Sequence, residues 1–465
     1  MLQMLMKMEA KADTITAVPI QAAERLEPKA WGERLSQLLA NRRGHLFGLL
    51  AFYLLLFVEY YRFVYGSFSL RMGFAFAFDP VRVLIGFGMV ALLLAMLSLR
   101  SSSDRMYAVS VVVALLSCLP QIVLYQLGGN SPFGSLYALL LLLLLAIPAL
   151  KIPRLRVPKI SAGRSVGILL ILTLLSLVPF FVAYGLPTDL SVFAMDERIY
   201  ETRREAVQQG TLLTAYLQGP LCKVLLPLMM LFGIGDVRKR WPLLLVGLAG
   251  MLYLFISNPE KSIFFSVFIV LACYLFRDCY AKAGMLIYGL LAVCVLSVLV
   301  HLFTGSLMAE SIVVRRLFFI PALVTEAYFA FFAGDPVCLS HSVLGSLIEY
   351  PYAVEPSHLV GQMMYGRSTI NCNTGIIADG FMNFGHIGAV LFVAMTAFVL
   401  HLVEACDYDS RFFGLVFLLL YTFLNSAFFT TLLTHGGFFL LLVLLFFSIK
   451  NPQLVDRDNT LTASA

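Results

Sequence analysis

Long apolar stretches separated by short polar segments run along most of the chain. A helix needs about 17–25 predominantly apolar residues to cross the hydrocarbon core of a bilayer. About twelve stretches approach or reach that length, near residues 44–64, 79–99, 106–127, 134–150, 164–184, 211–234, 241–257, 262–276, 284–303, 374–402, 412–430 and 433–449. The pattern predicts an all-α polytopic membrane protein with about twelve transmembrane helices.

The charges in the connections between these stretches predict the orientation, because cytoplasmic connections carry an excess of Lys and Arg. Every second connection is basic, and its cations are Arg42, Arg43, Arg100, Arg105, Lys151, Arg154, Arg156, Lys159, Arg164, Arg238, Lys239, Arg240, Arg277 and Lys282. We therefore predict a cytoplasmic leader at 1–43, a transmembrane domain at 44–450 and a cytoplasmic tail at 451–465. Two of the opposite, external connections are long, at about 185–210 and 304–373.

The apolar run LFFIPALVTEAYFAFFA at 317–333 is a further candidate span. Pro321 and Glu326 interrupt it, and counting it would place the tail residues Lys450 and Arg457 outside. We therefore expect an interfacial or re-entrant element at the outer membrane surface.

The composition agrees with a membrane protein and excludes other classes. The hydrophobic fraction is 60% and the charged fraction 13%, which is too apolar for a soluble chain of 465 residues. The net charge is +6, but the cations lie in short connections, so nucleic acid is not an expected partner. The sequence contains no H-E-x-x-H motif, no Cys/His cluster and no Gly-rich phosphate loop, so we expect no metal and no cofactor.

Polar residues stand at the mouth of the predicted helix at 374–402, and inside it. We expect this helix to begin near Thr374. Asp379, Asn383 and His386 then share one face, and Asp379 lies about 8 Å below the helix start. A carboxylate in this place is a candidate general base. The alternative is a polar packing network between closely spaced helices, which we favour for Asn383 and His386.

Several cations in the external connections run against the charge bias that sets the orientation. Arg315 and Arg316 are adjacent in the longest connection, Lys261 lies in the turn SNPEKS, and Arg203 lies in YETRREAVQQG. Arg binds phosphate through two parallel hydrogen bonds and Lys supplies a point charge, so we expect an anionic partner. The alternative is contact with lipid headgroups or local ion pairing.

The longest external connection also carries Cys338, His341 and Cys372. In an oxidising compartment the two cysteines could close a disulfide, and the alternative is two free or buried thiols. His341 is a second candidate for a base.

Four stretches resemble the Wzy-type O-antigen polymerases of bacteria, which join oligosaccharide repeat units. They are YETRREAVQQG with the following KVLLPLMM, then SNPEKSIFFSVFIVL, RRLFFIPALVTEAYFAFFAGDPVCLSHS and NTGIIADGFMNFGHIGAVL. Together with the hydropathy profile, they cover most of the chain from about 200 to 395. Lys261 departs from the pattern, because related polymerases and ligases usually carry an Arg in this turn.

The resemblance implies an inner-membrane glycosyltransferase with a fold similar to the GT-C class, acting at the periplasmic face. Donor and acceptor would both be oligosaccharides linked to undecaprenyl diphosphate, and the other expected partners are the lipid bilayer, a chain-length regulator and a flippase of the same pathway. Cations would stabilise the departing diphosphate and a base would deprotonate the acceptor hydroxyl. The residues expected for these roles are Arg315, Arg316, Lys261 and, as a helper, Arg203 for the diphosphate, and Asp379, then His341, for the base.

Two other functions stay open at this point. An O-antigen ligase would share the fold and the cations but would transfer the polysaccharide to lipid A–core. A polysaccharide flippase or other transporter would need a polar path through the membrane, whereas the polar intramembrane residues gather toward the outer side.

Overall fold

The computed structural model describes residues 28–99, 103–147, 150–186, 191–194, 198–342 and 344–449. The chain divides into two compact units, Met1–Leu38 and Leu39–Ala465. In the first unit the structure describes α2 (Pro28–Leu39), and the second unit holds all the helices discussed below. The predicted tail at 451–465 and most of the predicted leader at 1–43 lie outside the described residues.

Helices form nearly all of the described part of the second unit, together with one isolated bridge between Ile160 and Phe447. The first half contains α3 (Arg42–Glu59), η1 (Tyr60–Tyr65), α4 (Gly66–Met72), α5 (Pro80–Ser98), α6 (Asp104–Val113), η2 (Ala114–Cys118), α7 (Leu119–Leu127), α8 (Phe133–Ala146), α9 (Ala162–Tyr184), η4 (Ser191–Ala194), α10 (Arg198–Gln209), α11 (Leu212–Pro220), η5 (Leu221–Leu225) and α12 (Leu226–Gly235). The second half contains α13 (Val237–Ser257), α14 (Lys261–Leu275), α15 (Cys279–Thr304), α16 (Met308–Glu310), η6 (Ser311–Phe319), α17 (Ile320–Phe332), α18 (Pro356–Tyr365), α19 (Ile376–Ala405), η7 (Ser410–Phe412), α20 (Phe413–Asn425), α21 (Phe428–Leu433) and α22 (Gly437–Phe446).

Eight helical stretches among the described residues have the length and apolar composition needed to cross a membrane. They are Arg42–Ser69, Pro80–Ser98, Asp104–Leu127, Ala162–Tyr184, Leu212–Gly235, Val237–Ser257, Cys279–Thr304 and Ile376–Ala405, and four shorter apolar helices lie at Phe133–Ala146, Ile263–Leu275, Ser410–Asn425 and Gly437–Phe446. Each stretch coincides with one of the ranges predicted from the sequence. The prediction of an all-α polytopic membrane protein is confirmed, while the exact number of spans and the likeness to the GT-C class stay predictions.

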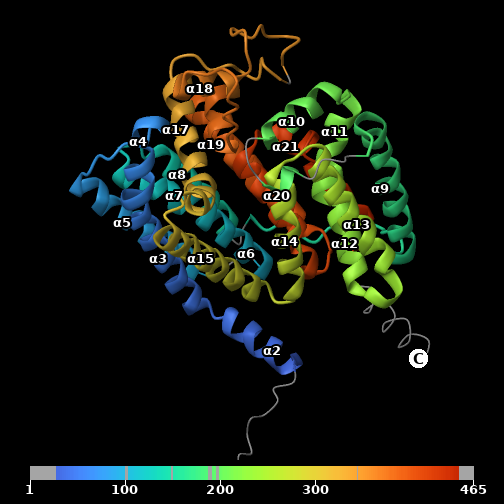
Figure 1. Cartoon of the computed structure of the whole chain (residues 1–465). Coiled ribbons are helices and arrows are strands. Elements are labelled where there is room, and N and C mark those ends of the chain that lie inside the picture. The colour runs from blue at the N-terminus through green and yellow to red at the C-terminus, as the bar shows by residue number, and fades with distance from the viewer. Residues whose placement is uncertain are drawn as a thin grey trace, which may run out of the picture. The chain divides into compact units, whose positions relative to one another are not determined.

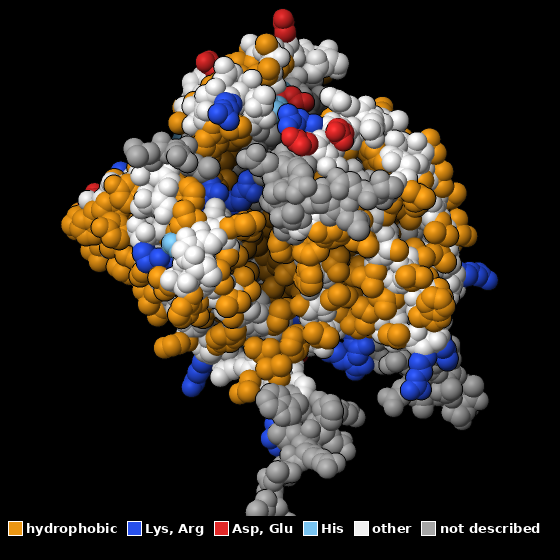
Figure 2. Space-filling view, viewed as in Figure 1, with side chains coloured by type: hydrophobic (Ala, Val, Ile, Leu, Met, Phe, Trp, Pro, Cys, Tyr) orange, Lys and Arg blue, Asp and Glu red, His pale blue; other side chains and the backbone are white. Residues whose placement is uncertain are grey.

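The helices differ in how much of their surface the protein covers. The stretch formed by α6, η2 and α7 is buried almost throughout, and it packs against α5, α8, α15 and α17 (Figure 1). By contrast, α9 exposes Leu175 and Val182, and α15 exposes Leu296 and Phe303. Figure 2 shows such side chains as a broad hydrophobic band, with Lys and Arg side chains along its lower edge. An exposed apolar surface of this extent is what lipid covers in a membrane protein.

The helix α19 is broken, so the predicted continuous helix through 374–402 is wrong at one point. Phe384 (φ −142°, ψ 24°) and Gly385 (φ 61°, ψ −147°) leave the helical conformation. A Cβ atom at Gly380 would lie 2.4 Å from the carbonyl oxygen of Gly388, which shows that the two halves of α19 fold against each other. Consequently His386 does not continue the face of the preceding turns: it is exposed and its Nδ1 lies 2.6 Å from the hydroxyl of Tyr137.

Replacing Gly385 with alanine is expected to lower the free energy of unfolding by about 1–3 kcal/mol, because side chains other than glycine rarely adopt its positive φ. Thermal unfolding of the detergent-purified protein measures this loss. Gly289→Ala in α15 is the matched control, because a Cβ atom there meets nothing within 4 Å. Equal stability of the two variants would contradict the described break in α19.

Candidate functional site

A cavity of about 300 Å³ lies between η5, α14, α20 and the connection from α21 to α22. In Figure 1, α14 lies beside α20 and α21 adjoins α20, in agreement with their contacts. Its polar lining consists of Arg203, Gln218, Lys223, Glu260, Ser266, Asn373, Tyr421, Thr422, Asn425, Ser426, Thr434 and His435. We call it the Lys223 cavity. The connections that contribute to the lining are the non-cytoplasmic ones of the predicted topology. The cavity therefore lies on the predicted external side.

Lys223 lies within an apolar helical stretch and its side chain lines the cavity. The residue belongs to the π-helical turn η5, which follows Pro220 and re-aims the side chains after it. The half-buried ammonium group has no hydrogen-bond partner within the part of the chain that the structure describes. The carboxylate of Glu260 lines the same cavity and acts electrostatically on this ammonium group, which keeps its hydrogen-bond donors for an anionic ligand.

A hydrogen-bonded chain of polar side chains crosses the rim of the cavity. Asn258 Nδ2 donates to Gln218 Oε1 at 2.9 Å, and Gln218 Nε2 donates to Glu260 Oε1 at 3.1 Å. The guanidinium of Arg203 lies 3.8 Å from the same Glu260 oxygen. Arg203 is 51% exposed, so this ion pair is weak and the guanidinium can exchange it for a bound anion. The predicted Arg203 is therefore part of the cavity.

His435 faces Lys223 from the connection between α21 and α22. Its position depends on Gly219, since a Cβ atom there would lie 2.1 Å from the carbonyl oxygen of Thr434. Burial, and then the positive charge of Lys223, lower the pKa of His435 to about 3. The imidazole is therefore neutral, and the same two effects make it a weak proton acceptor as long as no anion lies beside Lys223. A bound anion would offset the charge of Lys223 and raise this pKa.

Asp379 does not line the Lys223 cavity. Its side chain is 3% exposed, Oδ2 accepts the backbone N–H of Phe428 at 2.7 Å, and Oδ1 accepts Nδ2 of Asn383 at 3.0 Å. The role of Asp379 as a base stays a prediction, but its carboxylate is engaged with protein groups on both oxygens. The packing alternative fits Asn383, whose Oδ1 also accepts the backbone N–H of Leu339 at 2.7 Å.

His341 also lies apart from the residues that line the Lys223 cavity. Its half-buried ring stands 6.0 Å from that of Tyr350, and its Nδ1 has no hydrogen-bond partner among the described residues. Burial lowers its pKa. The structure therefore separates this candidate base from Arg203.

The remaining predicted cations lie on two other elements. Arg315 and Arg316 belong to η6. Arg315 is 7% exposed, and its Nε and Nη2 both donate to Ser311 Oγ. Its guanidinium also lies over the ring of Phe68, 4.3 Å from the ring centroid. Arg316 is exposed. Lys261 begins α14 next to Glu260, and its side chain lies outside what the structure describes.

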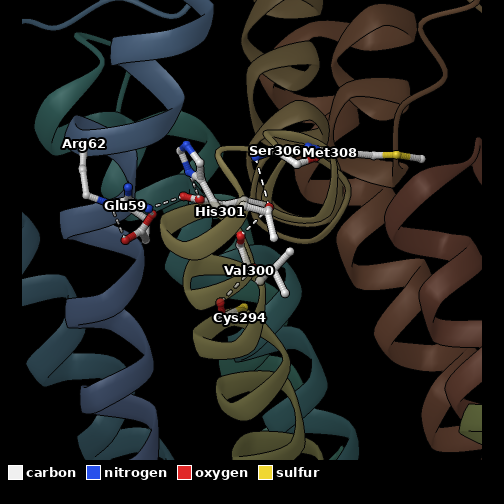
Figure 3. Close-up of polar contacts among 10 residues, drawn as sticks. Glu59, Arg62, Cys294, Val300, His301, Ser306 and Met308 are labelled. Carbon is white, nitrogen blue, oxygen red and sulfur yellow. Dashed lines mark hydrogen bonds and ion pairs between the residues drawn. The ribbon is translucent and has the colours of Figure 1, made fainter.

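A buried ionic network anchors the start of η6 (Figure 3). The side chain of Arg62 donates to Glu59 Oε1 at 3.0 Å and to Glu59 Oε2 at 2.6 Å, and it also pairs with Glu310. The other oxygen of Glu310 lies 2.5 Å from His301 Nδ1. Burial, and then the neighbouring Glu59, raise the pKa of Glu310 to about 8. One guanidinium thus faces two carboxyl groups, and a proton on this network balances the charge.

Glu310→Gln is expected to flatten the dependence of thermal stability on pH. The folded protein binds the Glu310 proton more tightly than the unfolded chain, so the stabilisation is fully present below about pH 4.5 and is lost as the pH rises through about 8. Unfolding temperatures at pH 5 to 9 measure this effect. The variant Glu349→Gln, at an exposed carboxyl, should keep the wild-type slope. A full wild-type slope in Glu310→Gln would contradict the assignment.

Cys338 and Cys372 are free thiols in the structure. Cys338 is half-buried and has φ +52°, whereas Cys372 is buried. Of the two alternatives left open from the sequence, the structure shows the free thiols.

Two functional candidates, Lys223 and His435, were missed at the sequence level. Lys223 carried a usable signal, because a lone Lys inside an apolar span indicates a functional position. His435 carried none, because it depends on how the 434–436 turn packs on Gly219.

No protein-family model, curated protein sequence or solved structure matches the chain. We therefore base the functional proposal on the residues and their geometry.

Proposed function

We propose that the protein is a membrane glycosyltransferase that polymerises oligosaccharide repeat units linked to undecaprenyl diphosphate, with the Lys223 cavity as its active site. The observation that carries the proposal is the combination of the ammonium of Lys223 with the neutral imidazole of His435 in one cavity. A cation and a base are the two groups that glycosyl transfer from a lipid diphosphate requires. The cavity opens within a helical bundle whose apolar surface suits a lipid-linked substrate.

Each cavity residue has a role in this reaction. An acceptor hydroxyl oxygen forms a bond to the anomeric carbon of the donor sugar, while the bond between that carbon and the diphosphate oxygen breaks. The hydroxyl proton moves to an imidazole nitrogen of His435 and leaves to water after the transfer. Lys223 stabilises the negative charge that develops on the departing diphosphate, and Arg203 supports it from the rim. No nucleotide is needed, because the lipid diphosphate already activates the sugar.

Uncharged polar groups of the cavity suit the sugar part of the substrate. The amides of Gln218, Asn373 and Asn425 have more donor and acceptor positions than their contacts within the protein use, and such groups bind sugar hydroxyls. The hydroxyl of Thr422 donates to the carbonyl of Leu418 and can accept a hydrogen bond from the sugar. The ring of Tyr421 adds an apolar surface to the same wall. A polar wall beside a cation fits a substrate with a sugar at one end and a diphosphate at the other.

The second lipid-linked oligosaccharide, the acceptor, also carries a diphosphate. Arg315 and Arg316 are retained as its candidate contacts, because both lie on η6 in the long external connection. Arg316 is exposed, whereas Arg315 is 7% exposed and would have to leave Ser311 to reach a ligand. Neither residue lines the Lys223 cavity. This separation fits a reaction in which the donor diphosphate binds in the cavity and the acceptor diphosphate binds elsewhere. The proposed site is periplasmic, in a protein of the bacterial inner membrane.

Deletion of the gene tests this function in the bacterium that encodes the chain, with lipopolysaccharide separated on a gel. A polymerase predicts the loss of the ladder while the band with a single repeat unit is kept. Loss of all capped species would instead identify an O-antigen ligase. An unchanged ladder would contradict both functions.

A further inference from the structure

The short helix α21 lies between Asp379 and the proposed base His435. Asp379 accepts a hydrogen bond from the first residue of α21, and further hydrogen bonds connect α21 to His435. We propose that Asp379 is a positioning residue that holds His435 in the cavity by fixing the start of α21. The inference rests on the proposed function of the Lys223 cavity. Asp379 itself does not line the cavity and does not touch substrate.

The start of α21 lacks an N-cap side chain of its own. The N-cap position is Ala427, which has no side-chain acceptor for the free backbone N–H groups of the first turn. The carboxylate of Asp379 replaces it from another helix, since Oδ2 accepts the N–H of Phe428 at 2.7 Å. Asp379 is 3% exposed, so water does not compete for this N–H.

The turn from Phe428 to His435 behaves as one hydrogen-bonded piece. The N–H of Thr431 donates to the carbonyl of Ala427 at 2.8 Å, and the N–H groups of Thr434 and His435 both donate to the carbonyl of Thr430, at 3.0 and 2.9 Å. A shift of the first residue of α21 is therefore passed to His435. Loss of the Asp379 contact would move the imidazole relative to the ammonium of Lys223.

The other oxygen of Asp379 fixes the carboxylate itself. Asp379 Oδ1 accepts a hydrogen bond from Asn383 Nδ2 at 3.0 Å. Asn383 Oδ1 in turn accepts a hydrogen bond from the backbone N–H of Leu339 at 2.7 Å. The N–H groups of Val337 and Cys338 donate to the carbonyls of Met382 and Asn383, which the break in α19 leaves free. The segment 337–339 of the external connection is therefore hydrogen-bonded to the end of the first half of α19, which carries Asp379. The Asp379 carboxylate links this region to α21.

Exchanging the two side chains tests positioning against catalysis. In Asp379→Asn/Asn383→Asp, the amide at 379 can still accept the N–H of Phe428 and donate to the carboxyl group at 383, and that carboxyl group can accept the N–H of Leu339. Nδ2 of Asn383 also donates to the backbone carbonyl of Asp379 at 2.8 Å, and a protonated carboxyl group at 383 can make this hydrogen bond in its place. The carboxylate meanwhile moves by one helical turn. A positioning residue tolerates this exchange, whereas a base at 379 does not.

We expect Asp379→Ala to lower kcat of the purified, folded protein by about 10- to 100-fold, with KM for the lipid-linked donor changed less than threefold. The exchange variant should recover at least a third of the wild-type kcat. Glu326→Gln is the matched control, because Glu326 also accepts a backbone N–H, that of Ser131 at 2.9 Å, but away from α21. It should keep the wild-type kcat. An exchange variant as impaired as Asp379→Ala would overturn the proposal.

A second measurement does not depend on activity, so it separates this proposal from the proposed function. In His435→Cys, the rate of labelling by a maleimide reports the position of residue 435, with the wild-type protein as background. Adding Asp379→Ala should change this rate by at least threefold, and adding the exchange pair instead should restore it. An unchanged rate would overturn the positioning role even if the protein polymerises sugars. A changed rate in a protein without glycosyltransferase activity would uphold the contact and overturn only the proposed function.

Discussion

Lys223→Ala is expected to remove the polysaccharide ladder from cells in which it replaces the wild-type gene, with kcat/KM of the folded protein lower by about 10²–10³-fold. The ammonium of Lys223 is the cation that lies inside the cavity rather than at its rim, and it faces the proposed base. Without it, the charge on the departing diphosphate is stabilised only by the exposed Arg203. Gel analysis of lipopolysaccharide and rates with the purified variant measure the loss.

Lys239→Ala is the matched control for this prediction. Lys239 is an exposed Lys at the start of α13, in one of the basic connections, and its loss changes the net charge by the same amount. This variant should restore a full ladder. A full ladder from Lys223→Ala would show that the cavity is not the site of transfer.

His435→Ala is expected to lower kcat by about 10²–10⁴-fold while the KM for the donor changes little, because a base acts on the acceptor proton and not on the diphosphate. His358→Ala, at a half-buried histidine of α18 outside the cavity lining, is the control. Steady-state rates with purified protein measure both variants. Equal rates for wild type and His435→Ala would remove His435 from the mechanism.

The pH dependence of the wild-type enzyme gives an independent check on His435. Burial, and then Lys223, lower the pKa of His435 to about 3, so the imidazole stays neutral down to that pH. A bound diphosphate offsets the charge of Lys223 and raises the pKa. The rate falls as the pH drops through the pKa of the base, so the acid limb of kcat should lie at higher pH than the acid limb of kcat/KM. Coincident limbs would contradict this coupling.

The membrane-type helices followed from the sequence because their signal is local. A stretch of apolar residues is sufficient to identify such a helix: among the described residues, eight of the twelve predicted ranges coincide with helices long and apolar enough to cross a membrane, and four coincide with shorter apolar helices. The break in α19 did not follow, because the Phe384–Gly385 pair is compatible with a continuous helix. The break also depends on N–H groups of Val337 and Cys338, far away in the chain, which satisfy the carbonyls that it frees.

The site was predictable only in part, for a related reason. Charge in the external connections singles out Arg315, Arg316, Lys261 and, as a helper, Arg203, and among these Arg203 lines the cavity. Depth on a straight helix predicts Asp379 as a candidate base, but this depth does not show which groups the carboxylate contacts. Its partner, the N–H of Phe428, lies 49 residues away in the chain and is brought close only by the packing of α19 against α21.

In the proposed function, the Lys223 cavity transfers sugar from one lipid diphosphate to another. The most direct test incubates the purified protein in liposomes with an undecaprenyl-diphosphate-linked repeat unit and a metal chelator, and measures the products by mass spectrometry. We predict a series of chain lengths with one undecaprenyl diphosphate released for each new linkage, and no such series with Lys223→Ala. The same series from Lys223→Ala, or no polymer from the wild-type protein with its matching repeat unit, would contradict the account.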